Sequence, residues 1–362
     1  MRVCKAWYAL ACPFLYEHII LGRNRVLAPL RDGLSRAVQE KRQAGWWTER
    51  LDVQMRDATT TPKAVFASLA GILRYLPNLC ILAFSITGHG FPSLLPKFVL
   101  NSVTSSSLKC VQWCNVVVKP SHQHWSAFLR KHPEMEYLDG EQATTLNAPV
   151  KLDAVKILYG YPICTGRRSA PRSTFDLPAV RSMFYDMTWG MGNDDFITFG
   201  GLGQQITEIQ LSFLDKDELD GQGPHIDLTF ARIRAECTRL TLVILAVHWW
   251  TILGSYIPTL PSTVHTLGIR IISGQASAAN VKRFFNTLLP SYAACNPAVK
   301  TIKFMDAKNI RALRSHPIAL WHGLHVAEEL GVAIKDSEDR KVVDLGKWWR
   351  VAPGQCKRGH LT

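Results

Sequence analysis

Cysteine and histidine residues approach a metal-binding spacing at one place in the sequence. Cys110 and Cys114 are followed by His122 and His124, and thiolate and imidazole groups are the ligands that zinc prefers. The apolar residues that alternate with the two cysteines instead predict a strand, with both thiols on its outer side. We therefore interpret these residues as ordinary strand thiols and neighbouring histidines, and we expect no metal.

Two further segments contain part of an ion-binding or phosphate-binding motif. The acidic run 215–221 lacks the turn glycine and the bidentate glutamate of a calcium loop, so it is predicted to be an exposed acidic turn. The glycine-rich run 200–203 has no following Lys-Ser/Thr, and it is predicted to be a plain turn. The sequence contains neither a Gly-x-Ser-x-Gly nor a His-Glu-x-x-His motif. We predict a protein that is not an enzyme and that uses no cofactor.

The length and composition of the chain limit the class of protein to which it can belong. The chain has 362 residues, 47% of them hydrophobic, and a formal net charge of +13. This length favours an extended or repetitive core over a single globule. Nine scattered cysteines, without a secretory start, are typical of reduced thiols, so we expect a cytoplasmic or nuclear protein. The uncharged run 240–257 is interpreted as a buried strand and further core structure, so no membrane partner is expected.

A spaced pattern of apolar residues recurs along most of the chain. Its form is apolar-x-x-apolar-x-apolar, and its last two positions alternate like a strand with one buried face. The pattern falls at Leu79, Leu82 and Phe84; Leu108, Val111 and Trp113; Met135 and Leu138; Val155 and Leu158; Val180, Met183 and Tyr185; Ile206, Ile209 and Leu211; Leu240, Val243 and Leu245; Val264, Leu267 and Ile269; and Val299, Ile302 and Phe304. An earlier strand is predicted at 50–55.

Amphipathic helical patterns separate many of these strands. They cover residues 62–75, 125–129, 230–240, 280–288 with Asn280 as the cap, and 318–330 with Gly331 as the stop. Most units are roughly 24–35 residues apart, which is the range of leucine-rich repeats. The sequence therefore predicts an α/β leucine-rich-repeat-like solenoid, with a curved parallel sheet and helices on the outer face. A non-repetitive α/β fold is the alternative.

The first residues resemble the end of an F-box. The motif reads Val3-Cys4-x-x-Trp7 and then Cys12-Pro13-x-x-Tyr16, which predicts a helix, a break at the proline and a strand. It is similar to fungal (basidiomycete-type) F-box proteins with degenerate leucine-rich repeats. The Leu-Pro start of an F-box and its earlier helices would precede this point, so the resemblance implies an N-terminally truncated F-box. The F-box remnant residues are Val3, Cys4, Trp7 and Tyr16. Val3, Cys4, Trp7 and Leu10 are the positions expected to pack on the preceding helices. We expect this helix either to fold back on the first repeat or to follow an upstream segment.

The resemblance also implies a domain organisation and a function. It divides the chain into an F-box remnant at 1–15, a degenerate leucine-rich-repeat-like domain at 16–340 and a basic tail at 341–362. Such proteins bind the Skp-type adaptor of a cullin-RING ligase through the F-box and hold a target protein on the repeats. The chain is thus expected to be a substrate receptor of an SCF-type ubiquitin ligase in protein degradation. Adaptor docking is expected only if the F-box is completed upstream.

The outer side of the predicted strands is the candidate protein-binding face. Its candidate residues are Gln112, Tyr159, Phe184, Asp186, Glu208, Gln210, Arg270 and Lys303. Acidic and basic residues balance among them, so the positive excess is assigned to loops, helices and the tail. A mixed polar and apolar face of this kind is typical of protein binding. A basic protein that binds nucleic acid or another anionic surface is the alternative.

Overall fold

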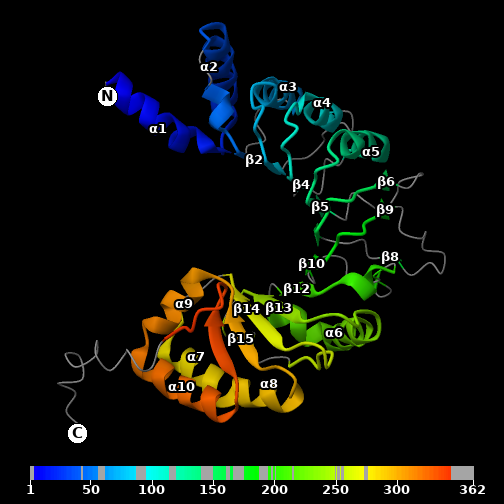
Figure 1. The fold of residues 1–362 in the computed structure, drawn as a ribbon, viewed down its shortest axis with the longest axis vertical. Coiled ribbons are helices and arrows are strands. Elements are labelled where there is room, and N and C mark those ends of the chain that lie inside the picture. The colour runs from blue at the N-terminus through cyan, green and yellow to red at the C-terminus, as the bar shows by residue number, and fades with distance from the viewer. Residues whose placement is uncertain are drawn as a thin grey trace. The chain divides into compact units, whose positions relative to one another are not determined.

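The computed structural model shows an α/β protein that divides into two compact units (Figure 1). It describes residues 4–41, 44–55, 62–86, 95–113, 120–139, 150–159, 164–165, 175–186, 195–196, 199, 201–213, 216–248, 250, 253, 257–272 and 276–343. Unit 1 comprises residues 1–162 and 167–183, and unit 2 comprises residues 163–166 and 184–362.

The strands form a 12-stranded open parallel sheet whose spatial order follows the chain, β1-β2-β3-β4-β5-β7-β10-β12-β13-β14-β15-β16. Unit 1 contributes β1 (His18–Leu21), β2 (Arg50–Met55), β3 (Ile81–Ile86), β4 (Cys110–Trp113), β5 (Tyr137–Asp139) and β7 (Ile157–Tyr159), and β10 (Ser182–Asp186) lies at the boundary between the units. Unit 2 contributes β12 (Glu208–Phe213), β13 (Leu242–Val247), β14 (Thr266–Ile271), β15 (Thr301–Phe304) and β16 (Ala333–Asp336). This order, in which each strand pairs with the next one along the chain, is compatible with the predicted solenoid.

Two short strand pairs stand outside this sheet. One pairs β6 (Val150–Lys151) with β9 (Phe175–Asp176) in parallel, and the other pairs β8 (Cys164–Thr165) with β11 (Asp195–Phe196) antiparallel.

Helices connect most successive strands of unit 1. The connecting helices are α2 (Leu27–Gln39), α3 (Pro62–Leu73), α4 (Leu95–Ser102) and α5 (His122–Lys131), with short 3-10 segments η1 (Asn24–Val26) and η2 (Ala44–Trp47), and α1 (Lys5–Glu17) precedes β1. Neighbouring helices from α2 to α5 pack side by side (Figure 1). Each strand–helix step therefore leaves an apolar edge that the next step covers.

Unit 2 repeats the arrangement with longer helical connections. They are η4 (Leu202–Gln205), α6 (Lys216–Glu236), α7 (Ala278–Arg283), the π-helical turn η6 (Phe284–Leu288), α8 (Leu289–Cys295), α9 (Ala307–Arg314) and α10 (Pro317–Glu329). The ring of Phe284 lies 5.6 Å from that of Phe304 on β15, and 6.3 Å from the buried indole of Trp250. Aromatic packing thus joins the α7–α8 layer to the sheet.

The recurring apolar pattern is the core of both units. Every residue assigned to it from the sequence is at most 7% exposed. The parallel register also aligns equivalent positions of successive units. Ile209 pairs with Val243, which pairs with Leu267, which pairs with Ile302. The prediction of inward strand positions is therefore confirmed.

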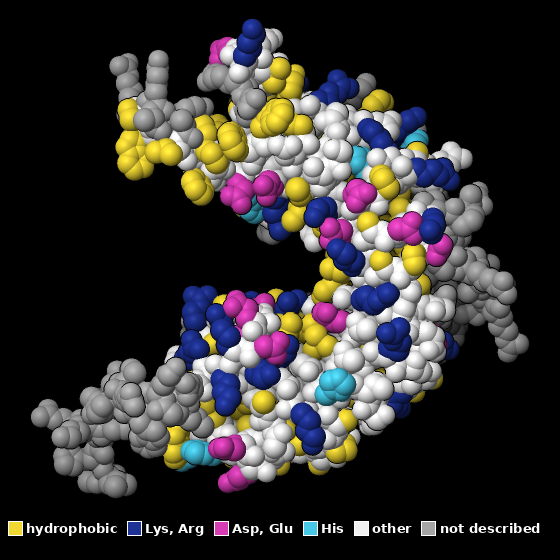
Figure 2. Space-filling view, in the orientation of Figure 1, with side chains coloured by type: hydrophobic (Ala, Val, Ile, Leu, Met, Phe, Trp, Pro, Cys, Tyr) yellow, Lys and Arg dark blue, Asp and Glu magenta, His cyan; other side chains and the backbone are white. Residues whose placement is uncertain are grey.

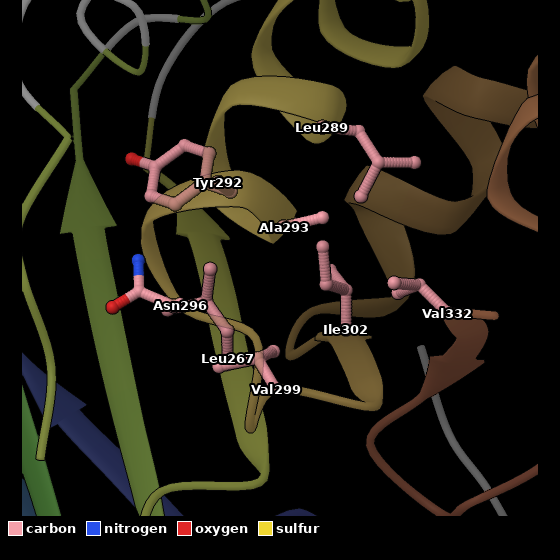
Figure 3. A pocket seen from close by; sticks show the side chains of 8 residues that line it. All are labelled: Leu267, Leu289, Tyr292, Ala293, Asn296, Val299, Ile302 and Val332. Carbon is pink, nitrogen blue, oxygen red and sulfur yellow. The ribbon is translucent and has the colours of Figure 1, made fainter. Parts of the chain in front are cut away.

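Two buried asparagines satisfy backbone groups inside unit 2. Asn309 is 3% exposed, and its side chain donates to the Ile271 carbonyl and accepts from the Ile271 N–H, both at 3.0 Å. Asn296 accepts from the Leu260 N–H at 2.7 Å and donates to the Pro258 carbonyl at 3.0 Å. The cavity beside Asn296 measures only about 10 Å³ (Figure 3), which is about the minimum for one water molecule. This part of the core has no room for a ligand.

The predicted break at Pro13 is wrong, because α1 continues from Lys5 to Glu17 through the proline. A proline inside a helix removes one hydrogen bond and usually costs stability. Here Cys12, beside the proline, is buried, and α1 packs against η2 and β1, so tertiary contacts hold the last turn.

Three local predictions at other helix ends also require correction. Ser277, not Asn280, caps α7, because its hydroxyl accepts from the Asn280 N–H at 3.1 Å. The acidic run 215–221 is not a turn, since the backbone is helical from Lys216, and acidic residues favour a first helical turn. The helix predicted at 230–240 ends at Glu236. The predicted stop at Gly331 is confirmed by its left-handed φ of +67°.

The uncharged run at 240–257 contributes β13. Among the described residues, we find no helix with the length and apolar character that crossing a bilayer demands.

Candidate protein-binding surfaces

Helix α1 carries an uncovered apolar stripe. Trp7, Leu10 and Phe14 are 66%, 65% and 79% exposed, and their spacing places them on one side of the helix. Hydrophobic side chains accordingly gather along α1 in the space-filling view (Figure 2). We call these three residues the α1 stripe. Exposed apolar residues that are contiguous in this way mark interaction sites more often than scattered ones do.

The opposite side of α1 faces its own unit. Cys12 is buried and Tyr16 is half-buried, while Cys4 caps the helix with its Sγ accepting from the Trp7 N–H at 3.5 Å. Tyr16 therefore packs on its own unit, whereas Cys4, Trp7 and Leu10 are exposed. The helix does not fold back to bury Trp7, because the side that packs on the unit is the one that carries Cys12. Val3 lies outside the described residues.

In unit 1, the outer side of the sheet presents aromatic and amide groups. Gln112 on β4 is half-buried, and Tyr159 on β7 is exposed. The ring of Tyr159 lies 6.2 Å from that of Tyr137 on the neighbouring strand β5, with the planes 29° apart. Phe184 on β10, where unit 2 begins, is half-buried, and the side chain of Asp186 lies outside the described part of the chain. The outward orientation predicted for Gln112, Tyr159 and Phe184 agrees with the alternating exposure of their strands.

A buried charge on the first two strands was missed from the sequence. Asp52 on β2 is 6% exposed and accepts hydrogen bonds from Arg50 Nε at 3.0 Å, while His18 Nε2 on β1 lies 2.8 Å from its Oδ2. Asp52 stands between the inward residues Leu51 and Val53, so strand alternation alone could have placed it on the outer side. Asp52, Arg50 and His18 therefore form a hydrogen-bonded polar cluster at the β1 edge of the sheet.

In unit 2, Arg270 spans one strand to reach another. Its guanidinium on β14 donates to Gln210 Oε1 on β12 at 2.6 Å, above the intervening strand β13. Ala246 and Ile244, which point outward from β13, are at most 1% exposed. The Asp306 carboxylate lies 3.5 Å from Arg270 Nε. The strand pattern predicts that Gln210 and Arg270 lie on one face of the sheet, and the structure shows a hydrogen bond between them.

Lys303 is likewise held by an acidic partner. Its Nζ lies 2.8 Å from Asp339, which also lies 3.5 Å from the Nζ of Lys335 on β16. The hydrogen bond from Lys303, with the charges of both lysines, holds the pKa of Asp339 below its usual range. Glu208 on β12 is half-buried. The balance of charge on this face thus depends on acids from loops after the strands, which the strand pattern did not reveal.

A third group of paired charges lies just before strands β4, β5 and β7. Glu136 accepts from Lys156 at 3.1 Å and lies 3.1 Å from Lys109. Hydrogen bonds from both lysines lower the pKa of Glu136, and the bond to Glu136 raises the pKa of Lys109. These two lysines are therefore engaged with protein groups.

The thiols and histidines do not form a metal-binding cluster within the described ranges. No group of three or more His, Cys, Asp or Glu residues there could hold a metal ion. Cys110 is half-buried on β4, and Cys114 lies outside those ranges. Burial raises the pKa of the Cys237 thiol to about 12, so it is protonated at neutral pH.

Comparison with models of known protein families and with curated protein sequences finds no match for this chain.

Proposed function

We propose that the chain is a protein-binding substrate receptor of an SCF-type ubiquitin ligase. In this proposal α1 is the closing helix of an F-box that binds a Skp-type adaptor, and the outer side of the sheet binds the target protein. The chain performs no covalent chemistry itself. Its role is to bring a target close to the ligase in the cytoplasm or nucleus.

The uncovered α1 stripe is the observation that carries the proposal. Full burial of a large apolar side chain is worth roughly 1.5–3 kcal/mol. Because Trp7, Leu10 and Phe14 are about two-thirds exposed or more, covering all three offers roughly 3–6 kcal/mol. An adjoining F-box segment and an adaptor helix would supply such a cover. Of the motif residues that resemble an F-box, Trp7, Cys12, Pro13 and Tyr16 lie on this same helix, and Cys4 caps it.

The strand faces support the second part of the proposal. Stacked tyrosines in unit 1 and the Arg270–Gln210 pair in unit 2 give a mixture of apolar area and held polar groups. Protein interfaces favour aromatic residues and arginine over lysine and free carboxylates. Side chains that are already held in place also lose less entropy when a partner binds.

Adaptor capture tests the proposal. The chain and a version extended by the in-frame upstream sequence are each immobilised and exposed to a purified Skp-type adaptor. We expect the extended version to retain the adaptor, and the double substitution Trp7→Ser and Leu10→Ser to reduce retention at least tenfold. The matched control is Ile318→Ser, which changes an exposed apolar residue of α10. Absence of the adaptor from both versions would remove the ligase role.

The alternative is a basic protein that binds nucleic acid. The net charge of +13 favours it, but Arg270, Lys303, Lys109 and Lys156 all have carboxylate partners. Retention on duplex DNA measured against salt concentration decides between the two, because phosphate contacts give a steep salt dependence. Lack of retention at low ionic strength would end this alternative.

A further inference from the structure

A cleft in unit 1 combines exposed indole rings with carboxylates. It has a volume of about 410 Å³ and lies between α1, η2 and the starts of β2 and β3. Trp46 and Trp47 come from η2, Glu17 from the end of α1, and Glu49 from the residue before β2. Ligand sites in proteins span about 300–1,000 Å³, so the cleft is large enough for a side chain with its flanking backbone.

The two indoles stand on a fixed backbone. The buried Gly45 lies so close to the Tyr75 carbonyl that a methyl group on its Cα would overlap this oxygen. Asn78 Nδ2 donates to the Trp46 carbonyl at 2.9 Å. With the backbone of η2 held on one side, Trp46 and Trp47 remain 52% and 45% exposed. A pair of exposed tryptophans on a rigid turn offers π faces without a large ordering cost.

The carboxylates of the cleft have no ion-pair partner among the described residues. Glu17 and Glu49 are both exposed, and they adjoin each other because the Glu49 N–H donates to the Glu17 carbonyl at 3.0 Å. The nearby Lys109 is directed to Glu136 at 3.1 Å. The thiol of Cys80, which also lines the cleft, has a raised pKa, chiefly from burial and further from the charge of Glu49. The charge of Lys109 acts against this rise, so the case for a cation in the cleft depends on the two exposed carboxylates themselves.

We infer that this cleft binds an arginine side chain of an extended peptide segment of a partner protein. A guanidinium stacks on indole faces and pairs with carboxylates through its planar donors, so it matches both components of the cleft. This recognition is separate from adaptor docking, which uses the α1 stripe. It needs neither an upstream segment nor the ligase, and it can be measured on the chain alone.

The probe is a dye-labelled, end-blocked peptide Ala-Ala-Arg-Ala-Ala, followed by fluorescence anisotropy. The matched peptide carries citrulline, which has nearly the shape of arginine and no charge. We expect the arginine peptide to bind at least about tenfold more tightly than the citrulline peptide, because only the charged guanidinium is attracted both by the indole faces and by the carboxylates.

Substitutions then assign the site. Glu49→Gln and Glu17→Gln are each expected to weaken the arginine peptide about threefold or more, and Trp47→Leu about fivefold. Glu40→Gln, an exposed change on the same unit, serves as the matched control and should leave binding unchanged. Equal binding of the two peptides, no binding at millimolar peptide, or indifference to the paired Glu17 and Glu49 substitutions would each overturn the inference.

Discussion

The buried imidazole of His132 makes the stability of unit 1 depend on pH. His132 follows α5 and is 4% exposed, with its ring 4.5 Å from that of Phe128. Neither ring nitrogen has a hydrogen-bond partner of ordinary geometry, although the Ser105 backbone lies near the ring. Burial, and then the charge of Lys131, lowers the pKa of His132 to about 4. The folded state therefore holds this ring in its neutral form.

The size of the effect follows from the difference between the folded and unfolded pKa. The unfolded chain has the ordinary histidine value of 6.5, so it binds more protons than the folded chain between pH 6.5 and 4. The free energy of unfolding is thus unaffected by His132 above about pH 6.5, and it falls as the pH decreases toward the folded pKa of His132. The loss from this one group is about 2 kcal/mol at pH 5 and about 3 kcal/mol at pH 4.

Urea unfolding of the wild type and of His132→Leu at pH 7.5 and pH 5 measures this loss. We expect the wild type to lose about 2 kcal/mol more than the variant between the two pH values. His132→Gln is the second variant, because it keeps a polar side chain but cannot titrate, and it should behave like the leucine variant. If all three proteins lose the same free energy, the ring of His132 is not buried in its neutral form.

Other substitutions test the packing and the charges. Asn309→Ala leaves the N–H and C=O of Ile271 unpaired, so we expect a loss of about 2–3 kcal/mol in urea unfolding, and an unchanged midpoint would contradict the bonds described. Gly323→Ala places a methyl group against the ring of Phe285, so thermal unfolding should occur several degrees lower, by about 1–3 kcal/mol of overpacking, and an equal or higher midpoint would show that α10 has room there. Glu136→Gln breaks only exposed ion pairs, which salt screens, so we expect its urea midpoint at high salt to match that of the wild type. A midpoint that is much lower than the wild-type value at high salt would mean that Lys109 and Lys156 are less solvated than described.

The strand core was readable from the sequence because one physical rule governs it. Each unit must bury the same side of its strand against the next unit, so residues such as Ile209, Val243 and Leu267 recur with fixed spacing. These inward positions can be predicted without knowing which residues far apart in the sequence are in contact, and all of them are buried.

Helix ends and charge partners were less accessible, because they depend on competition between local and distant contacts. Pro13 predicts a break, but the packing of α1 on η2 outweighs the lost hydrogen bond. Ser277 and Asn280 are both good caps by type, and only the backbone geometry selects the serine.

The partners of the outward cations illustrate the same limit. Asp306 and Asp339 lie after β15 and β16, so strand alternation does not bring them to Arg270 and Lys303. The cleft at Trp46 was also missed, since its residues come from four separate segments and share no sequence pattern.

Hydrogen–deuterium exchange of the upstream-extended chain, with and without the Skp-type adaptor, tests the central claim most directly. Adaptor binding to the α1 stripe predicts slower exchange in peptides that cover α1, and unchanged exchange in β12 to β16 of unit 2. Adaptor-dependent protection confined to the strands, or no protection of α1 at saturating adaptor, would contradict the account.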